Sequence, residues 1–358
     1  FPFLIFIAIL TYGCGTQEVS DAEEVPEGSK SMEVPEVEER VIEEPGPIVE
    51  EAPEEVKEIT KEVIEEPVVE PKPCGSLYDA YTRITGGPQD SGEVKESELA
   101  SLLAKRMEET DVGCALLVGV DVTDFDTQQQ IRDSIDYYAT IINSHPGRFV
   151  PLLDIDADSA SEITVDLIKQ ILEEAEGKID YRGFGEVSFV DPGPWKSKKL
   201  TDKPLPEIIE FLGENDMILA AHIRNGQTIE LDTTLSQHPN TKILVHGNPS
   251  GMKELLAKHK NLYYAAELEI MLGQGTFSCS ISSTDSKVNS AVSQYAPIIA
   301  AAPEQVLFAT NAHSKCHFQP QFYSEMIEFT DKFIEKLPEE HRDLFAYKNA
   351  LALFGVPN

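Results

Sequence analysis

The chain has 358 residues, a formal net charge of −34 and a hydrophobic content of 41%. The hydrophobic content is that of an ordinary globular protein. The strong acidity argues against a nucleic-acid-binding protein, because phosphate contacts need clustered lysine and arginine. The charge is uneven: residues 16–73 hold 20 acidic and 5 basic residues, a net of −15.

The chain opens with an apolar run, FPFLIFIAIL, followed by TYGCG. This run is shorter than the roughly 20 apolar residues that a transmembrane helix needs, and its length is typical of a signal-peptide core. Gly13 and Cys14 resemble the end of a bacterial lipoprotein cleavage box. Residues 1–14 therefore predict export to the cell envelope and a membrane anchor through lipidated Cys14, with a plain signal peptide or an uncleaved anchor as alternatives.

Residues 15–74 form a Glu-, Val- and Pro-rich segment. Eight prolines in residues 16–73 interrupt any long helix, and the like charges repel each other. Too little apolar surface remains to offset the entropy of ordering this segment. It is predicted to be a disordered acidic linker, with a partly helical stretch around EEVKEITKEVIEE as the alternative.

From residue 75 to the end, short runs rich in Val, Ile and Leu alternate with amphipathic stretches. The expected strands, in chain order, are 76–83, 113–121, 148–156, 181–189, 216–224, 241–248, 261–269 and 305–312. Apolar strands separated by helices predict a parallel sheet covered by helices, and eight such units predict a closed (β/α)8 TIM-type barrel. An open doubly wound sheet is the alternative, but no GxGxxG motif follows the first strand.

Polar and ionisable residues recur at the carboxyl ends of these strands, where a barrel of this type carries its functional groups. They are Tyr81, Arg83, Asp121, Asp154, Asp156, Glu186, His222, Arg224, His246, Asn248, Glu267, Glu269, Asn311 and His313. Each one alone is explained by the start of a solvated loop. Their recurrence on one rim is the main functional signal in the sequence.

Several motifs in order resemble the amidohydrolase superfamily, in particular its amidohydrolase-related branch of metal-dependent hydrolases and decarboxylases. They are SHPGRFVPLLDID, YRGFGEVSF, ILAAHIRNG, LSQHPNTKILVHGN, VLFATNAH and KNALALFGV. The resemblance implies a barrel whose metal ions activate a water for hydrolysis. It also implies that Glu186, His222 and His246 are metal ligands, holding at most one divalent cation, with zinc the first choice.

The other half of the family's metal site is broken in this chain. Tyr81 and Arg83 stand where the family has a histidine pair, and Asn311 replaces its aspartate. Arginine does not ligate metals, and an asparagine side chain is not a general base. His313 is the nearest candidate for a replacement base.

Three interpretations of function are therefore left open, and the sequence does not decide whether the protein is an enzyme. In one interpretation, a single metal on the surviving ligands supports hydrolysis. In the second, the barrel is non-catalytic and binds a small anionic ligand through Tyr81, Arg83 and Arg224. In the third, it is a structural or interaction module that binds a protein partner. Arg83 could pair with Glu186, but the sequence alone leaves open whether it does or points elsewhere.

Four further expectations concern single residues and loops. Cys279 and Cys316, in the loops after the last two strands, are candidates for a disulfide, whereas Cys114 is interpreted as a plain core residue. Residues 271–290 are expected to form a long loop, with a lid over the site as one interpretation. Trp195 is a candidate to stack on a ligand.

Overall fold

The computed structural model describes residues 74–84, 95–122, 125–190, 193–272 and 283–357. The predicted signal segment, Cys14 and almost all of the acidic linker lie outside these residues, as does Cys279. Among the described residues, no helix combines the length and the apolar character needed to cross a membrane.

A single sheet of parallel strands forms the centre of the fold, in the order β1-β2-β3-β4-β5-β6-β7-β8. Its strands are β1 (Leu77–Thr82), β2 (Val112–Val122), β3 (Phe149–Ile155), β4 (Gly183–Ser188), β5 (Ile218–Ile223), β6 (Lys242–Gly247), β7 (Leu262–Glu267) and β8 (Val306–Ala309). All eight agree with the predicted strands, which are longer by a residue or more at most of their ends. Their side chains are almost all buried, as expected for strands covered on both faces.

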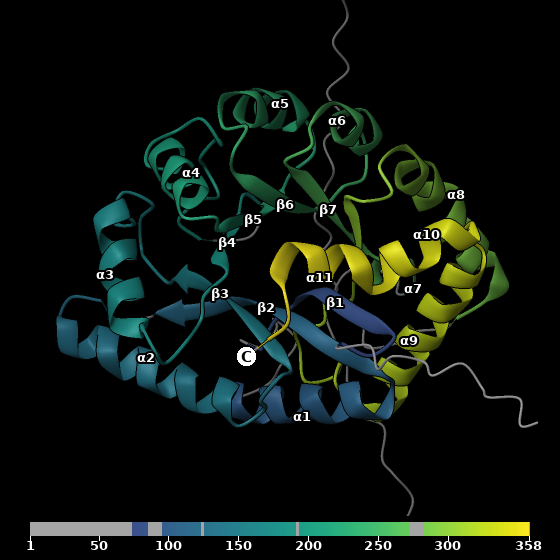
Figure 1. Cartoon of the computed structure of the whole chain (residues 1–358), viewed down its shortest axis with the longest axis horizontal. Coiled ribbons are helices and arrows are strands. Elements are labelled where there is room, and N and C mark those ends of the chain that lie inside the picture. Colours follow the sequence, from purple (N-terminus) through teal and green to yellow (C-terminus); the bar gives the residue numbers. More distant parts are fainter. Residues whose placement is uncertain (1–73, 85–94, 123–124, 191–192, 273–282, 358) are drawn as a thin grey trace, which may run out of the picture. The chain divides into compact units, whose positions relative to one another are not determined.

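Helices surround this sheet as a ring (Figure 1). They are α1 (Glu96–Glu109), α2 (Gln128–Asn143), α3 (Val165–Ala175), α4 (Leu205–Glu214), α5 (Thr228–Gln237), α6 (Met252–Lys258), α7 (Glu269–Leu272), α8 (Asp285–Ala301) and α9 (Pro320–Glu335). The alternation of strand and helix around a ring confirms the (β/α)8 TIM-type barrel.

The barrel is brought together where β1 meets β8. The backbone N–H of Asn311 donates to the carbonyl of Tyr81, and the N–H of Arg83 donates to the carbonyl of Ala312, both at 2.9 Å. The buried carboxylate of Asp79, in β1, accepts hydrogen bonds from the backbone and the hydroxyl of Thr310. These bonds hold the first and last strands side by side and carry Tyr81, Arg83 and Asn311 to one place.

The chain ends in a helical segment that packs against the opposite end of the barrel. It consists of α10 (Glu339–Asp343), a π-helical turn (Leu344–Lys348) and α11 (Asn349–Phe354). The Asn349 amide donates to the carbonyl of Val306 at the start of β8, and Phe354 contacts the ring of Tyr78 near the start of β1. This segment therefore covers the amino ends of the strands and leaves their carboxyl ends to the site.

A disulfide joins Cys74, just before β1, to Cys114 in β2, and both residues are fully buried. The interpretation of Cys114 as a plain core residue is therefore wrong. Gly113 makes this approach possible: a Cβ there would lie 2.0 Å from the backbone carbon of Cys74. Cys316, in turn, is described, but its predicted partner Cys279 is not, so that pairing stays a prediction.

The expected loop at residues 271–290 is shorter than predicted at its carboxyl end, because α8 begins at Asp285. Thr284 caps this helix by accepting a hydrogen bond from the backbone N–H of Lys287. Residues 273–282 lie outside the described residues, so the lid interpretation stays a prediction.

Candidate metal centre

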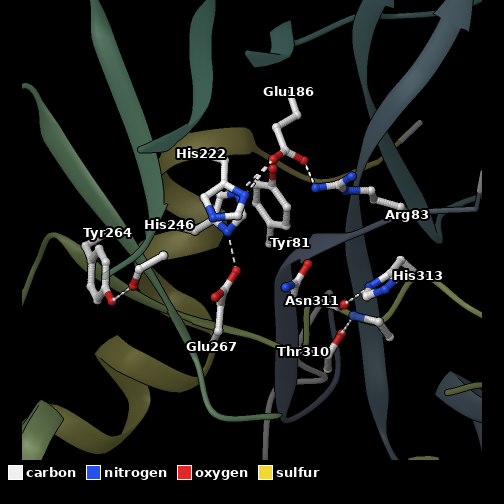
Figure 2. A network of polar contacts seen from close by, with 12 residues as sticks. Tyr81, Arg83, Glu186, His222, His246, Tyr264, Glu267, Thr310, Asn311 and His313 are labelled. Carbon is white, nitrogen blue, oxygen red and sulfur yellow. Dashed lines mark hydrogen bonds and ion pairs between the residues drawn. The ribbon is translucent and has the colours of Figure 1, made fainter. Parts of the chain in front are cut away.

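Three predicted ligands converge inside the carboxyl end of the barrel. Glu186, His222 and His246 come from β4, β5 and β6, and each offers a ligand atom within 4.8 Å of the other two (Figure 2). His222 and His246 are direct neighbours in the parallel register of β5 and β6, so their side chains emerge on the same face. The sheet itself brings these residues together.

The distances within this group are those of a compact coordination site. Oε1 of Glu186 lies 3.2 Å from Nδ1 of His222 and 3.1 Å from Nε2 of His246. Ligand atoms bound to one zinc ion at about 2.0–2.1 Å in tetrahedral geometry lie about 3.3–3.4 Å apart. The three side chains thus fit a divalent cation without rearrangement of the strands that carry them.

The ring of His246 is held from three directions. Tyr81 lies against it with ring centroids 4.0 Å apart, and the ring of His222 lies 4.1 Å away. Nδ1 of His246 contacts the carboxylate of Glu267, which comes from the end of β7. Burial lowers the pKa of His246 to about 4, so its imidazole is neutral at neutral pH.

Glu267 is a buried carboxylate that the sequence places on the rim without indicating a role. Burial acts to raise the pKa of Glu267, but the neighbouring His246 outweighs it and the pKa is lowered overall. The residue is therefore an anion beside the Nδ1 of a buried histidine. Only the tertiary structure pairs the two, because they lie 21 residues apart on different strands.

Arg83 forms an ion pair with Glu186, which decides the orientation that the sequence left open. Its Nη2 contacts Oε2 of Glu186, which leaves the other carboxylate oxygen, Oε1, directed toward the two histidines. The guanidinium also lies over the ring of Tyr81, with Cζ 5.9 Å from the ring centroid. The arginine side chain is 26% exposed and the glutamate 4%, so the pair lies at the inner edge of the site.

Asn311 follows the end of β8 and is buried, and its backbone N–H donates to the carbonyl of Tyr81 (Figure 2 shows its side chain). Its Oδ1 has no hydrogen-bond partner among the described residues. Its φ of +52° is in the left-handed region, which asparagine and aspartate adopt more readily than most residues. An unsatisfied buried acceptor at this point is available to a donor on a ligand or a water.

His313 lies close to Asn311 but farther from the ligand group (Figure 2). Its Nδ1 lies 2.7 Å from the backbone carbonyl of Asn311, which requires the proton on Nδ1 and makes Nε2 the basic nitrogen. The residue is buried, and its ring lies edge-on to that of His317. Its role as a base stays a prediction.

Arg224 is oriented differently from Arg83. Its guanidinium donates to the backbone carbonyls of Lys196 and Lys198, in the loop after β4. This arginine therefore fastens a loop at the rim, and its predicted contact with a ligand stays a prediction.

A cavity of about 180 Å³ adjoins the ligand group on the side of β2, β3 and β4. It is lined by Arg83, Asp121, Asp154, Ile155, Asp156, Glu186, Ser188, Gly193, Pro194 and Trp195. Carboxylates outnumber the single arginine in this lining, so an anionic ligand would have only Arg83 as a cationic partner here. Trp195 is buried and lines the cavity, and its predicted contact with a ligand stays a prediction.

The aspartates of this cavity are crowded. Burial raises the pKa of Asp121 well above its ordinary value, and the nearby Asp154 and Asp156 raise it further. Burial also raises the pKa of Asp154, to about 7. Asp154 is fixed in place, because its Oδ2 accepts a hydrogen bond from the backbone N–H of Glu186 at 3.1 Å. The lining therefore carries less negative charge at neutral pH than its composition indicates.

Comparisons with known proteins agree with this architecture. A family model described as "Amidohydrolase" matches residues 111–356. Among solved structures, the chain is similar to a probable 2-pyrone-4,6-dicarboxylic acid hydrolase from Acinetobacter baumannii with bound citric acid, at 10% identity and a TM-score of 0.52. It is also similar to an amidohydrolase from Burkholderia multivorans with bound zinc, at 11% identity and a TM-score of 0.53. Each match covers 78% of this chain and 99% of the other. No curated protein matches.

Proposed function

Because the chain belongs to the amidohydrolase family, we propose that its barrel is a hydrolase that works with one divalent metal ion, most simply zinc, on Glu186, His222 and His246. The observation that supports this most strongly is the convergence of three ligand side chains, whose donor atoms lie within 4.8 Å of one another. If Nδ1 of His246 keeps its proton for Glu267, its Nε2 has none and faces Oε1 of Glu186 at 3.1 Å. Two lone pairs repel at that distance unless a cation lies between them.

Three protein ligands with an open fourth position are typical of catalytic rather than structural zinc. A divalent cation held in this way supplies Lewis acidity, which polarises a carbonyl group or lowers the pKa of a water. The chain's own residues contribute the rest. Glu186 is steered by Arg83, Tyr81 excludes water from one face of His246, and the cavity beside Trp195 offers room for a small substrate.

Arg83 also explains why one metal ion is proposed and not two. The family's second ion would need the histidine pair that is replaced here by Tyr81 and Arg83. The guanidinium is permanently charged and lies within contact of Glu186, so it repels a further cation at this point. It simultaneously provides a fixed positive charge that can stabilise an oxyanion on a substrate.

A second candidate function rests on Arg83 and Asn311 together. The ion pair with Arg83 already neutralises Glu186, and Asn311 offers no carboxylate to accept a proton. Both features suit a non-catalytic barrel that binds a small molecule through its cavity. Metal content separates the two candidates, because the second does not require a metal ion.

We also propose that the protein is exported and anchored to a membrane of the cell envelope through lipidated Cys14. The buried disulfide between Cys74 and Cys114 supports export, since disulfides persist in oxidising compartments and are rare in the cytosol. Labelling with a lipid precursor tests the anchor: Cys14→Ala should abolish incorporation, and incorporation that persists in this variant contradicts the proposal.

The test of the metal site is elemental analysis of the full chain, purified without chelators and without a metal-binding tag. We expect close to one equivalent of zinc, manganese or iron, and loss of that metal in a His222→Ala, His246→Ala double variant. A His145→Ala, His238→Ala double variant is the matched control, since both histidines lie in loops before strands, away from the ligand group. No metal in the wild type, even after incubation with excess zinc, would contradict the proposal and favour the non-catalytic candidate.

A further inference from the structure

Glu267 is placed to act on His246 through a direct side-chain contact. It lies at the end of β7, is 2% exposed, and its Oε1 contacts Nδ1 of His246 (Figure 2). Its own backbone is fixed by the hydroxyl of Tyr295, which donates to the carbonyl of Glu267 at 3.4 Å. The carboxylate therefore has little freedom to leave the histidine.

This contact decides which nitrogen of His246 carries the proton. Both carboxylates beside the ring, Glu267 at Nδ1 and Glu186 at Nε2, can only accept a hydrogen bond; because Glu186 is already paired with Arg83, the neutral imidazole keeps its proton on Nδ1 for Glu267. Nε2 is then the nitrogen with a lone pair, and it is the one directed toward Glu186. Without Glu267, the other tautomer would place a proton where a metal ion has to bind.

We propose that Glu267 is a positioning residue that holds His246 in the Nδ1–H tautomer and thereby sets the affinity of the barrel for a divalent metal ion. The proposal rests on the metal site described under the proposed function and adds a residue to it. Carboxylates that accept from a ligating histidine typically contribute 10- to 100-fold to metal affinity, through orientation and through increased basicity of the ring.

Three substitutions in the full chain separate this role from a general effect on the barrel. Glu267→Ala removes the acceptor, and Glu267→Gln keeps an acceptor oxygen but removes the charge. Gln305→Ala is the matched control: Gln305 is also a buried polar residue of the barrel, but its amide donates to the backbone carbonyls of His259 and Leu262, at the amino end of β7, and contacts none of the three predicted metal ligands. Thermal melting of each metal-free variant shows whether it is folded.

The first measurement is the zinc dissociation constant, obtained by competition with a chromophoric chelator. We expect Glu267→Ala to weaken binding about 10- to 100-fold. Glu267→Gln should restore part of that loss, and Gln305→Ala should change the constant less than about threefold. A folded Glu267→Ala variant that binds zinc as tightly as the wild type would overturn the proposal while leaving the metal site intact.

The second measurement needs no substitution at Glu267. Nitrogen-15 shifts of the histidine rings in the metal-free wild type report the tautomer of His246, assigned by comparison with a His246→Asn variant. We expect the Nδ1–H form, and a dominant Nε2–H form would overturn the proposal. A wild type that shows the Nδ1–H form but binds no zinc would instead overturn the proposed function.

Discussion

Removing the crosslink between Cys74 and Cys114 should cost the barrel several kilocalories per mole of stability. The two residues are separated by 40 positions in the sequence, so the disulfide closes a loop of that length in the unfolded chain. In the chain-entropy model, a loop of 40 residues corresponds to about 13 cal/mol/K, or about 4 kcal/mol at 25 °C. Both cysteines are fully buried, so alanine replaces them without exposing a new polar group in the core.

The assay is urea unfolding of a Cys74→Ala, Cys114→Ala double variant, followed by circular dichroism. The unfolding entropy of a barrel of roughly 285 residues is about 0.6 kcal/mol/K, so the same loss lowers the melting temperature by about 7 °C. A Cys279→Ala, Cys316→Ala variant unfolded with and without a reductant is the matched control, since only the Cys74–Cys114 crosslink then differs and both of its side chains remain. A double variant within about 1 kcal/mol of the oxidised wild type would refute the reasoning.

Three further predictions concern the site and the strand junction. Arg83→Ala leaves Glu186 without its ion pair and should lower the free energy of unfolding by about 2–3 kcal/mol, which is less than for a fully buried pair because the guanidinium is partly exposed. In thermal melts, added zinc should recover most of this loss. No recovery would contradict a metal site on Glu186. Asn311→Asp returns a carboxylate to the end of β8, and aspartate adopts the left-handed backbone at this position as readily as asparagine does. In a screen of ester and lactone substrates with zinc, we expect the variant to hydrolyse at least 10²-fold faster than the wild type. Unchanged rates would count against hydrolysis at this centre. Burial raises the pKa of Asp79 to about 7, so the folded state holds a proton that the unfolded state releases above about pH 4, and the free energy of unfolding should fall as pH rises from about 4 to 7. In urea titrations, Asp79→Asn should remove of the order of 4 kcal/mol of that fall. The same dependence of stability on pH in wild type and variant would be the contrary result.

The fold could be predicted from the sequence because each strand is a continuous apolar run bounded by polar residues. Periodicity places such runs well and also places the polar residues at their carboxyl ends, so Glu186, His222 and His246 could be assigned to one rim. An ion pair between Arg83 and Glu186 could be considered from charge alone, because a partly buried carboxylate favours a nearby cation, but the direction of the Arg83 side chain could not be predicted. These features depend on local pattern and on elementary electrostatics.

The remaining features depend on distances across the barrel that no local pattern contains. Glu267 is recognisable in the sequence as a polar residue at a strand end, but its contact with His246 joins neighbouring strands and exists only in the folded register. The disulfide could not be predicted for the same reason: Cys114 lies within an apolar run, and only the bare backbone at Gly113 lets Cys74 reach it. The start of α8, by contrast, could have been found in the sequence, because Thr284 and Asp285 are a recognisable helix start. The small polar residues around them favour a loop, and the prediction followed that composition.

The crosslink at Cys74 also determines how mechanical load would enter the barrel. The chain reaches the described barrel at Cys74, on the side where the strands begin, and the disulfide passes directly to β2. A pull on the preceding residues is therefore shared between β1 and β2 and is not carried by the hydrogen bonds of β1 alone. Those bonds position Tyr81 and Arg83, so the crosslink shields the site from tension at the end of the barrel farthest from it.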